Sequence, residues 1–461
     1  MAIKKMKNIK ICCIGAGYVG GPTMAVIANK CANVKITVVD SDKDKINRWN
    51  GDLDNLPVFE PGLKELIELN RNKNLFFSNE INDAIRDSSI IFIAVNTPTL
   101  ESGPGAGFGA DLKYIRLCAE QIARVANEDK IIVEKSTVPI KTAEMLNEVF
   151  REINPKYNFE VLSNPEFLAE GTAIEDLLNP DRVLIGGDNT ISGKKSVKIL
   201  FDIYSKWIPK EKILTTNVWS SELSKLASNA MLAQRISSIN SLSALCDKTG
   251  ADILEVSNAI GHDHRIGKYF LSPSVGFGGS CFQKDILNLV YLCRNFGLNE
   301  VAEYWHQVVK INDYQKKRLT NKILDNLGKD LSNKNITLFG WSFKKDTNDS
   351  RESASIYITK DLLELGANIK IYDPKSSIDI IINDLLNISN LSINELNQRV
   401  TFYDDHVKSV VDSNCIVILT EWDEFKQFKW DELQNKLSYE KIIFDGRFIL
   451  NSIYTNKVIT L

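Results

Sequence analysis

Cys281 is the residue whose position most strongly suggests chemistry. It lies in the segment GFGGSCFQKD, just before an apolar helical run, and Asp285 follows four residues later. If the helix begins near Ser280, the two side chains lie one turn apart. The helix dipole then favours a thiolate at residue 281, whereas the like charge of Asp285 opposes it. A buried structural cysteine is the alternative, but flanking glycines and charges do not belong in an apolar core. We therefore favour a functional thiol that holds a covalent redox intermediate.

A glycine-rich turn near the N-terminus has the spacing of a nucleotide site. Gly15, Gly17 and Gly20 form GxGxxG between an apolar strand and a helix. The first glycine permits a tight turn, the second lets the backbone approach a pyrophosphate, and the third lets the helix pack on the strand. Asp40 follows Gly20 by twenty residues. Its carboxylate would accept both ribose hydroxyls and repel a 2′-phosphate, which favours NAD over NADP, although Lys45 nearby weakens that preference.

Two further pairs of residues could belong either to a functional site or to an ordinary solvent-exposed surface. Lys225 and Asn229 are spaced i, i+4 on a long helical segment and share one face. Taken alone, this spacing favours a solvent-exposed pair, because a lysine on a helix usually faces solvent. Glu166 and Glu170 lie in NPEFLAEG, just after a predicted strand, where open α/β sheets bind ligands. Ordinary loop glutamates are an equally good interpretation of that pair.

The composition is that of an ordinary globular protein, and it excludes several classes. The chain has 461 residues, enough for two or three domains. A net charge of -3 gives no general attraction to nucleic acid or to an anionic membrane. We identify no apolar run of membrane-spanning length and no targeting segment, and expect a cytoplasmic protein. Eight scattered cysteines favour reduced, mostly buried thiols, and four histidines without a CxxC pair give no basis for a metal site.

The elements that must hold these residues follow a strand–helix rhythm at the start of the chain. Strands predicted at 9–14, 35–40, 90–95, 130–134 and 160–163 alternate with amphipathic stretches. This alternation implies a parallel sheet that is covered on both faces.

The middle of the chain is helical, and the strand–helix rhythm then returns. Residues 219–250 predict one long helix closed by Gly250, and helical patterns continue to about residue 327. A second strand–helix–strand unit at 335–373 lacks the three-glycine fingerprint, so we expect it to bind a different nucleotide group. The segment 376–399, rich in Asn, Ile and Ser, is expected to be a surface excursion. The predicted fold is α/β, with two doubly wound, Rossmann-like domains joined by an all-helical central domain with one long helix.

Long segments of this chain resemble the UDP-glucose/GDP-mannose dehydrogenase family, and within it the animal-type UDP-glucose 6-dehydrogenases. The matching segments include ICCIGAGYVGGPT, VNTPT, EKSTVP, LSNPEFLAEGTA, NPDRVLIGG, WSSELSKLA, LAQRISSIN, VGFGGSCFQKD, FKKDT and FDGR. They cover almost the whole chain. The resemblance implies three domains: an NAD-binding domain at 1–215, a helical dimerisation domain at 216–328 and a UDP-sugar domain at 329–461.

The same resemblance implies an activity. It is the four-electron oxidation of UDP-glucose to UDP-glucuronate with two NAD, through a thiohemiacetal and then a thioester on Cys281. An enclosed covalent intermediate stops a reactive aldehyde from escaping between two oxidations. The family also implies a homo-oligomer, either a homodimer or a hexamer built from dimers.

The resemblance assigns residues to roles by position. Lys225 would stabilise oxyanions at C6, and Asp285 would help to activate water. The predicted catalytic set is Cys281, Lys225, Asp285, Glu166, Asn229 and Thr137, with the proton steps left open among them. The predicted NAD contacts are Gly15, Ala16, Gly17, Tyr18, Val19, Gly20, Asp40, Lys45, Val95, Asn96, Thr97, Pro98, Thr99, Ser136, Thr137, Glu170, Lys284 and Arg351. The predicted substrate contacts are Glu166, Phe167, Leu168, Lys225, Asn229, Arg265, Ser272, Phe277, Gly278, Phe343, Lys344 and Arg447.

One departure from the family pattern and three other interpretations stay open. Ser272 and Pro273 stand where animal enzymes usually carry a lysine and an alanine, which weakens the expected backbone contact to the sugar. A related dehydrogenase for another GDP- or UDP-sugar would share Cys281 and Lys225. A two-electron 3-hydroxyacid dehydrogenase would lose little on Cys281→Ser. A catalytically inactive nucleotide sensor would bind both ligands without producing NADH.

Overall fold

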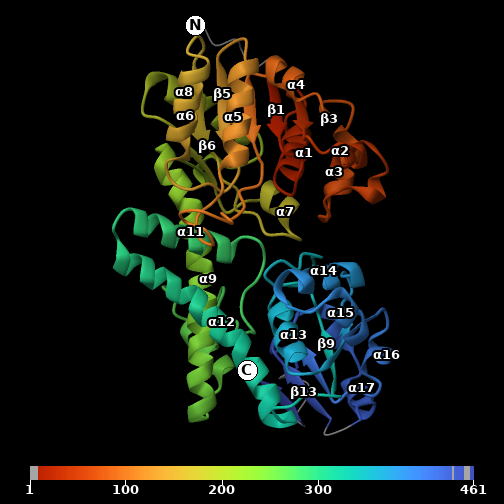
Figure 1. Cartoon of the computed structure of the whole chain (residues 1–461). Helices are drawn as coiled ribbons and strands as arrows, with labels where there is room; N and C mark the ends of the chain where they lie inside the picture. Colours follow the sequence, from red (N-terminus) through yellow and green to blue (C-terminus); the bar gives the residue numbers. More distant parts are fainter. Residues whose placement is uncertain (1–8, 439–440, 451–456) are drawn as a thin grey trace. The chain divides into compact units, whose positions relative to one another are not determined.

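The computed structural model describes residues 9–438, 441–450 and 457–461 (Figure 1). The chain divides into two compact units, residues 1–228 and 229–461, and the boundary falls inside the long helix α9 (Val218–Thr249). Each unit contains its own β-sheet. A search of the described residues for a helix long and apolar enough to cross a membrane found none.

The first unit is built on an eight-stranded sheet in the order β3-β2-β1-β4-β5-β6-β7-β8. Its strands are β1 (Lys10–Ile14), β2 (Lys35–Val39), β3 (Leu75–Ser78), β4 (Ile90–Ile93), β5 (Lys130–Glu134), β6 (Phe159–Ser163), β7 (Val183–Gly186) and β8 (Ile213–Thr216). The first six follow the order of a doubly wound dinucleotide-binding sheet, whose switch point lies between β1 and β4. This confirms the fold class predicted for the start of the chain.

One pair of strands departs from the expected parallel arrangement. β7 runs antiparallel to β6, and the two meet only at their ends, with Ser163 opposite Gly186. The segment between them holds only the short helix α7 (Ala173–Leu178), whereas a parallel neighbour usually needs a full crossover helix. Residues 164–182 therefore stay at the carboxyl edge of the sheet, where ligands bind in this architecture.

Helices cover both faces of this sheet. They are α1 (Gly20–Lys30), α2 (Lys43–Asn50), α3 (Leu63–Asn70), α4 (Ile81–Asp87), α5 (Lys113–Val125), α6 (Thr142–Ile153), α7 and α8 (Ile191–Tyr204). Consecutive residues of β1 enter different cores: Ile11 and Cys13 pack with α1, whereas Cys12 and Ile14 pack with α5. A strand buried on both sides reads as a continuous apolar run, which is what KICCI shows.

The central helices match the predicted helical region. α9 is 32 residues long, and Gly250, with φ of +79°, ends it in the left-handed conformation that favours glycine. The others are α10 (Ile253–Gly261), α11 (Phe282–Asn295) and α12 (Asn299–Leu327). α11 packs against α12 within the second unit.

A second sheet has six strands, all parallel, in the order β11-β10-β9-β12-β13-β14. The strands are β9 (Asn335–Phe339), β10 (Asn368–Tyr372), β11 (Val400–Tyr403), β12 (Cys415–Ile418), β13 (Ile442–Asp445) and β14 (Val458–Thr460). Its helices are α13 (Ala354–Glu364), α14 (Ile378–Ile388), α15 (Ile393–Arg399), α16 (His406–Val410) and α17 (Trp430–Asn435). The strand order repeats that of the first six strands of the other sheet and confirms a second Rossmann-like unit.

The second sheet repeats the acidic residue after its second strand, at Asp373. Asp373 is buried and accepts hydrogen bonds from the backbone N–H of Trp341 at 2.6 Å and of Ser342 at 3.1 Å. The indole N–H of Trp422 also donates to it, at 3.1 Å. Asp373 therefore supports the loop after β9.

The expectation for residues 376–399 is wrong, because this segment is part of the folded core. It forms α14 and α15, and the side chains of Ile381, Leu385 and Leu396 are fully buried. The capping box of Ser392 and Glu395 starts α15. Apolar residues at helical spacing outweigh the Asn- and Ser-rich composition on which the expectation rested.

Candidate active site

The glycine turn of the first unit leaves room for a ligand at one position only. A Cβ on Gly15, whose φ is +110°, would lie 2.3 Å from the carbonyl oxygen of Ala94. A Cβ on Gly20 would lie 2.0 Å from the carbonyl oxygen of Gly15. Nothing lies within 4 Å of the Cβ position of Gly17. The outer glycines are therefore required by packing, and the middle one opens the backbone to an approaching phosphate.

Asp40 is held as an ionised carboxylate beside this turn. Its Oδ2 accepts hydrogen bonds from the backbone N–H of Ala16 at 2.9 Å and from Nζ of Lys45 at 3.1 Å. Burial raises the pKa of Asp40, but the N–H groups of Ala16 and Asp42, together with Lys45, leave the pKa below its usual value. The turn and the carboxylate fit the phosphate and the ribose of a dinucleotide, and Lys45 lies next to that carboxylate.

The other predicted cofactor segments of the first unit meet at the same edge of the sheet. The hydroxyl of Ser136, which follows β5, donates to the carbonyl of Val95 at 2.7 Å. The hydroxyl of Thr97 donates to the carbonyl of Thr137 at 2.8 Å. The loops after β4 and β5 are thus bonded to each other at the carboxyl edge of the sheet, next to its switch point.

Lys225 and Glu166 form a buried ion pair, so the solvated interpretation of Lys225 is wrong. Nζ of Lys225 lies 3.1 Å from Oε1 of Glu166, and their side chains are only 4% and 8% exposed. The other carboxylate oxygen accepts the backbone N–H of Leu168 at 2.7 Å. Two cations lie near the ring of Phe167: the guanidinium carbon of Arg182 is 3.8 Å and Nζ of Lys225 is 5.6 Å from its centre.

The charge state of Glu166 follows from these neighbours. Burial alone raises the pKa of Glu166. The charge of Lys225, the Leu168 N–H, the hydrogen bond from Lys225 and the charge of Lys135 outweigh that penalty, and the pKa ends below its ordinary value. Glu166 is therefore a carboxylate at neutral pH, although it is almost completely buried.

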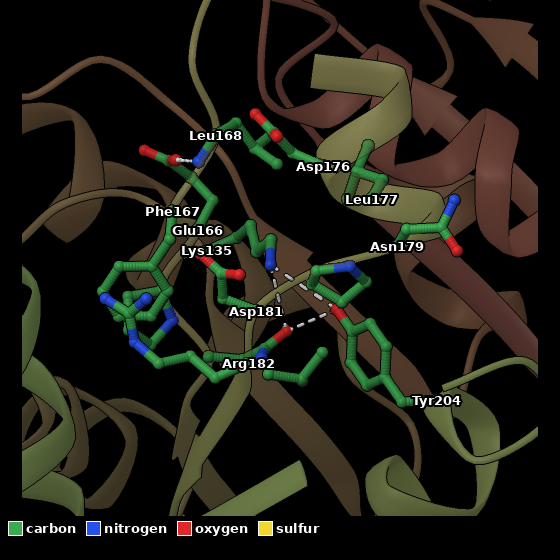
Figure 2. Close-up of a pocket in the computed structure, with 14 residues that line it drawn as sticks. Lys135, Glu166, Phe167, Leu168, Asp176, Leu177, Asn179, Asp181, Arg182 and Tyr204 are labelled. Atoms are coloured by element: carbon green, nitrogen blue, oxygen red, sulfur yellow. Dashed lines mark hydrogen bonds between the residues drawn. The ribbon is translucent and has the colours of Figure 1, made fainter. Parts of the chain in front are cut away.

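A cavity lies beside this ion pair, and some of its residues were not predicted as site residues. It has a volume of about 110 Å³, and Lys135, Asn164, Glu166, Phe167, Asp181, Arg182 and Tyr204 are among the residues that line it (Figure 2). Lys135 directly follows the apolar strand IIVE, and that position at a strand's carboxyl end was the available signal.

In the second unit, Cys281 stands at the start of α11, as its spacing predicted. It is the N-cap residue, and its carbonyl accepts the backbone N–H of Asp285 at 2.9 Å. The hydroxyl of Ser280 lies 3.5 Å from the Cys281 sulfur. The other seven cysteines are buried, whereas Cys281 is partly exposed. All eight are free thiols, and burial raises the pKa of Cys13 to about 12, so that thiol stays protonated.

Asp285 is buried and is bonded to the long helix. Nδ2 of Asn229 donates to its Oδ2 at 2.6 Å, and Nζ of Lys284 lies 3.9 Å from its Oδ1. Asn229 is itself buried, so it is not a solvated surface residue. The amide fixes the carboxylate of Asp285 one helical turn from Cys281.

The loop before Cys281 is bonded to the second Rossmann-like domain at several points. The backbone N–H of Val275 donates to the carbonyl of Gly446 at 2.9 Å, and that of Gly279 donates to the carbonyl of Arg351 at 2.8 Å. A Cβ on Gly278 would lie 2.9 Å from Cβ of Phe343, so only glycine fits there. These contacts bring the loop to the segments that hold the predicted substrate residues.

The predicted substrate residues Phe277, Phe343 and Arg447 lie in or beside this loop. Phe277 is bonded through its backbone to the buried Asn312. Arg447 donates from Nη2 to the carbonyl of Phe343 at 2.9 Å and from Nε to that of Leu419 at 2.7 Å. These two bonds hold the guanidinium of Arg447 in place.

The side chains of three other predicted residues are exposed or pair with a near neighbour in the sequence. Arg265 is 79% exposed and pairs with Asp263 at 2.6 Å. Ser272 is exposed. Arg351, a predicted cofactor contact, pairs with Asp349 at 2.7 Å in the second unit. Their predicted roles remain predictions.

Three family models match the chain in succession. They describe the NAD-binding domain (residues 9–208), the central domain (219–314) and the UDP-binding domain (337–452) of the UDP-glucose/GDP-mannose dehydrogenase family. Together they cover most of the sequence.

Individual proteins give the same result. UDP-glucose 6-dehydrogenase of Mus musculus is 54% identical over 447 residues, 97% of this chain and 90% of the mouse protein. The protein of the same name from Drosophila melanogaster is 53% identical over 96% of this chain and 93% of its own length. A solved UDP-glucose dehydrogenase from Pyrobaculum islandicum superposes with a TM-score of 0.84 at 27% identity, covering 100% of this chain and 98% of that one. The chain has a dinucleotide turn and two Rossmann-like sheets, and its relatives are more than half identical over nearly its full length. It is therefore an NAD-dependent dehydrogenase and belongs to the UDP-glucose/GDP-mannose dehydrogenase family.

Proposed function

We propose that this protein oxidises UDP-glucose to UDP-glucuronate in two successive NAD-dependent steps. The observation that carries the proposal is the similarity, above half identity and over nearly the whole chain, to animal proteins named UDP-glucose 6-dehydrogenase. The position of Cys281 supports it, since a partly exposed thiol at a helix N-terminus suits covalent chemistry that a simple alcohol dehydrogenase does not need.

The covalent steps use Cys281 as the nucleophile, and their atoms and electrons balance as follows. The C6 hydroxyl first loses a proton and a hydride, which leaves an aldehyde. The thiolate adds to the aldehyde carbon, and the oxygen takes up a proton to give a thiohemiacetal. Loss of a second hydride and of that proton leaves a thioester. Water then adds to the thioester, the C–S bond breaks, and the products are a carboxylate, the regenerated thiolate and two protons. One UDP-glucose, two NAD and one water thus give UDP-glucuronate, two NADH and three protons.

The proposal assigns the remaining groups by charge. The ammonium of Lys225, already paired with Glu166, suits the negative oxygen that develops at C6. Asp285, bonded to Asn229, suits the positioning and deprotonation of the hydrolytic water. Thr137 lies in the first unit at the carboxyl edge of its sheet. We leave the order of the proton transfers open among these groups.

The binding groups follow the same logic. NAD, when bound, accepts the hydride in each oxidation. The open backbone at Gly17 suits its pyrophosphate, and the ionised Asp40 suits its ribose hydroxyls. For the UDP-sugar, Lys344 and Arg447 supply cations in the part of the chain that matches the UDP-binding domain.

The deciding measurement is the amount of NADH formed per UDP-glucose consumed by the purified chain. Two NADH support the four-electron reaction, whereas one NADH, or none, contradicts it. A panel of other UDP- and GDP-sugars tests the substrate, and faster turnover on any of them would replace UDP-glucose in the proposal.

Cys281→Ser tests the covalent intermediate. We expect complete turnover to be lost, because a serine hydroxyl is a poor nucleophile and its ester a poor intermediate at neutral pH. Cys293→Ser is the matched control, since Cys293 is a buried thiol on the same helix. Full activity in Cys281→Ser rules out the thioester, and an equal loss in both variants attributes the defect to the fold.

We further propose three domains at 1–215, 216–328 and 329–461, and a homo-oligomer in the cytoplasm. Large apolar side chains on the central helices support the assembly, among them Leu245 at 60% and Tyr304 at 55% exposure. Light scattering of the purified protein tests it. A monomer at micromolar concentration contradicts the proposal, and a dimer or a hexamer agrees with it.

A further inference from the structure

Lys135 is a buried lysine beside the predicted catalytic pair, and no step described so far uses it. It follows β5, and its side chain is almost completely buried. Its Nζ lies 3.3 Å from Oδ1 of Asn164 and 3.5 Å from the hydroxyl of Tyr204 (Figure 2). These partners are neutral oxygens, and they are already bonded to each other at 2.7 Å. They orient the ammonium but do not neutralise it.

The charge that balances Lys135 belongs to Glu166. The two groups attract each other electrostatically, whereas Lys135 and Lys225 repel each other. One carboxylate therefore lies near two buried ammonium groups. When all three groups are ionised, they together carry one net positive charge, and their side chains are largely buried.

A second buried lysine, Lys130, lies at the other end of β5 and provides a comparison, because its contacts are those of a structural residue. Lys130, at the start of β5, is equally buried, but its Nζ contacts the carbonyls of Ser88 at 2.7 Å and Arg86 at 3.0 Å, and Glu128 at 3.4 Å. Those contacts tie two segments of backbone together. Lys135 contacts no backbone carbonyl in this way among its described hydrogen bonds, and it lies at the opposite, carboxyl end of the strand.

We propose that Lys135 is a positioning residue for the reaction at the Lys225–Glu166 pair: its buried ammonium adds a second cation beside Glu166 and leaves these three groups with an excess positive charge that favours an anionic oxygen on the substrate. This rests on the function proposed above. Lys225 alone would be cancelled by Glu166, so the excess charge comes from the second lysine. A developing alkoxide at C6 is the anion of matching charge.

The ionisable groups around Lys135 determine how the excess positive charge depends on pH. The ionisable groups that face it are Glu166 after β6, Lys225 on α9, Tyr204 on α8 and Cys13 on β1, and Asp176, Asp181 and Arg182 also line the cavity. Burial is the largest influence and lowers the pKa of Lys135 to about 8. The excess charge is thus present at neutral pH and is lost as the pH rises above about 8.

The test compares Lys135→Met, Lys135→Gln and Lys135→Arg with Lys130→Met in the full chain. We expect both neutral variants at 135 to lower kcat roughly ten- to a hundredfold, with KM for NAD within about twofold of wild type. The acidic limb of the kcat profile should move to higher pH, because Glu166 has lost one of its two cations. Lys135→Arg should recover part of the rate. Lys135→Gln can still bond Asn164 and Tyr204, which covers the case in which Lys135→Met does not fold.

A second readout does not depend on turnover. Infrared spectra of protein labelled with carbon-13 at its glutamates, with Glu166→Gln as the reference, follow the protonation of Glu166 with pH. The midpoint should rise in Lys135→Met and in Lys135→Gln and stay unchanged in Lys130→Met. An unchanged midpoint, or a loss of kcat that is equal in the variants at 130 and 135, overturns the role of Lys135. A wild-type protein that does not oxidise UDP-glucose overturns the proposed function instead, while the titration still reports on Lys135.

Discussion

Replacing Lys135 by methionine should stabilise the first unit while it impairs the reaction. Lys135 is buried, and burial, the largest influence, lowers its pKa from 10.5 to about 8. At about 1.4 kcal/mol per pKa unit, that shift corresponds to roughly 3 kcal/mol of destabilisation at pH 7. Methionine has a similar length and no charge, and it adapts well to irregular cores.

The hydrogen bonds of Lys135 reduce the gain in stability expected from Lys135→Met. Its contacts to Asn164 and Tyr204 are long, at 3.3 and 3.5 Å, and each contributes about 1 kcal/mol or less. Asn164 and Tyr204 stay bonded to each other after the change, so neither is left without a partner. We therefore expect Lys135→Met to raise the free energy of unfolding by about 1 to 3 kcal/mol at pH 7.

The pH dependence of the free energy of unfolding tests independently whether Lys135 destabilises the folded protein. The folded pKa of Lys135 lies below the unfolded value of 10.5, so between about 8 and 10.5 the unfolded chain binds a proton that the folded chain has released. The stability contribution of Lys135 therefore rises with pH across that window. The advantage of Lys135→Met should be largest below pH 8 and should shrink towards pH 10.5.

Hydrogen exchange of peptides from β5 and β6 measures this unit directly in the full chain. At pH 7, protection should increase roughly fivefold to a hundredfold in Lys135→Met, since about 1.4 kcal/mol is a factor of ten. Lys130→Met should instead decrease it, because the carbonyls of Arg86 and Ser88 lose their partner. A Lys135→Met protein that is less stable than wild type at pH 7, or an advantage that is the same at pH 7 and pH 10, would refute the reasoning.

Three other changes test separate parts of the molecule. Glu134 and Glu222 are buried against each other, and burial is the main reason why the pKa of Glu134 is raised and that of Glu222 reaches about 6. Because both pKa values lie above the ordinary 4.5, the stability contribution of this pair is complete below pH 4.5 and falls as the pH rises, through about 6 for Glu222. Glu134→Gln should therefore stabilise the protein more at pH 8 than at pH 5, as urea unfolding at both values will show. Asp40→Asn removes the carboxylate that disfavours a 2′-phosphate and leaves Lys45 to bind it, so the ratio of kcat/KM for NADP to that for NAD should rise roughly tenfold or more. Leu385→Ala empties a fully buried site in α14 and should cost about 2 to 5 kcal/mol in urea unfolding, whereas a surface excursion would lose almost nothing.

Local sequence patterns determined most of the fold. The period of apolar residues located the strands β1, β5 and β9, and the proline-free run ending at Gly250 located α9 almost to the residue. The glycine turn and Asp40 could be predicted together because their spacing follows from one strand–helix–strand unit. Cys281 could be placed at a helix start for the same reason, since a cap and an apolar period are short-range features.

Only the tertiary structure decided which charged residues are buried and what neutralises them. Lys225 looks like a surface lysine along the helix, and its partner Glu166 lies in a distant loop that the antiparallel strand β7 keeps at the edge of the sheet. Asn229 meets Asp285 across 56 residues of sequence. Lys130 begins β5 and Lys135 directly follows it, yet Lys130 contacts the backbone carbonyls of Arg86 and Ser88, whereas Lys135 interacts with the buried carboxylate of Glu166. Periodicity reports which face of an element is apolar, whereas burial of a charge depends on groups that folding brings from elsewhere in the chain, and no local pattern encodes those.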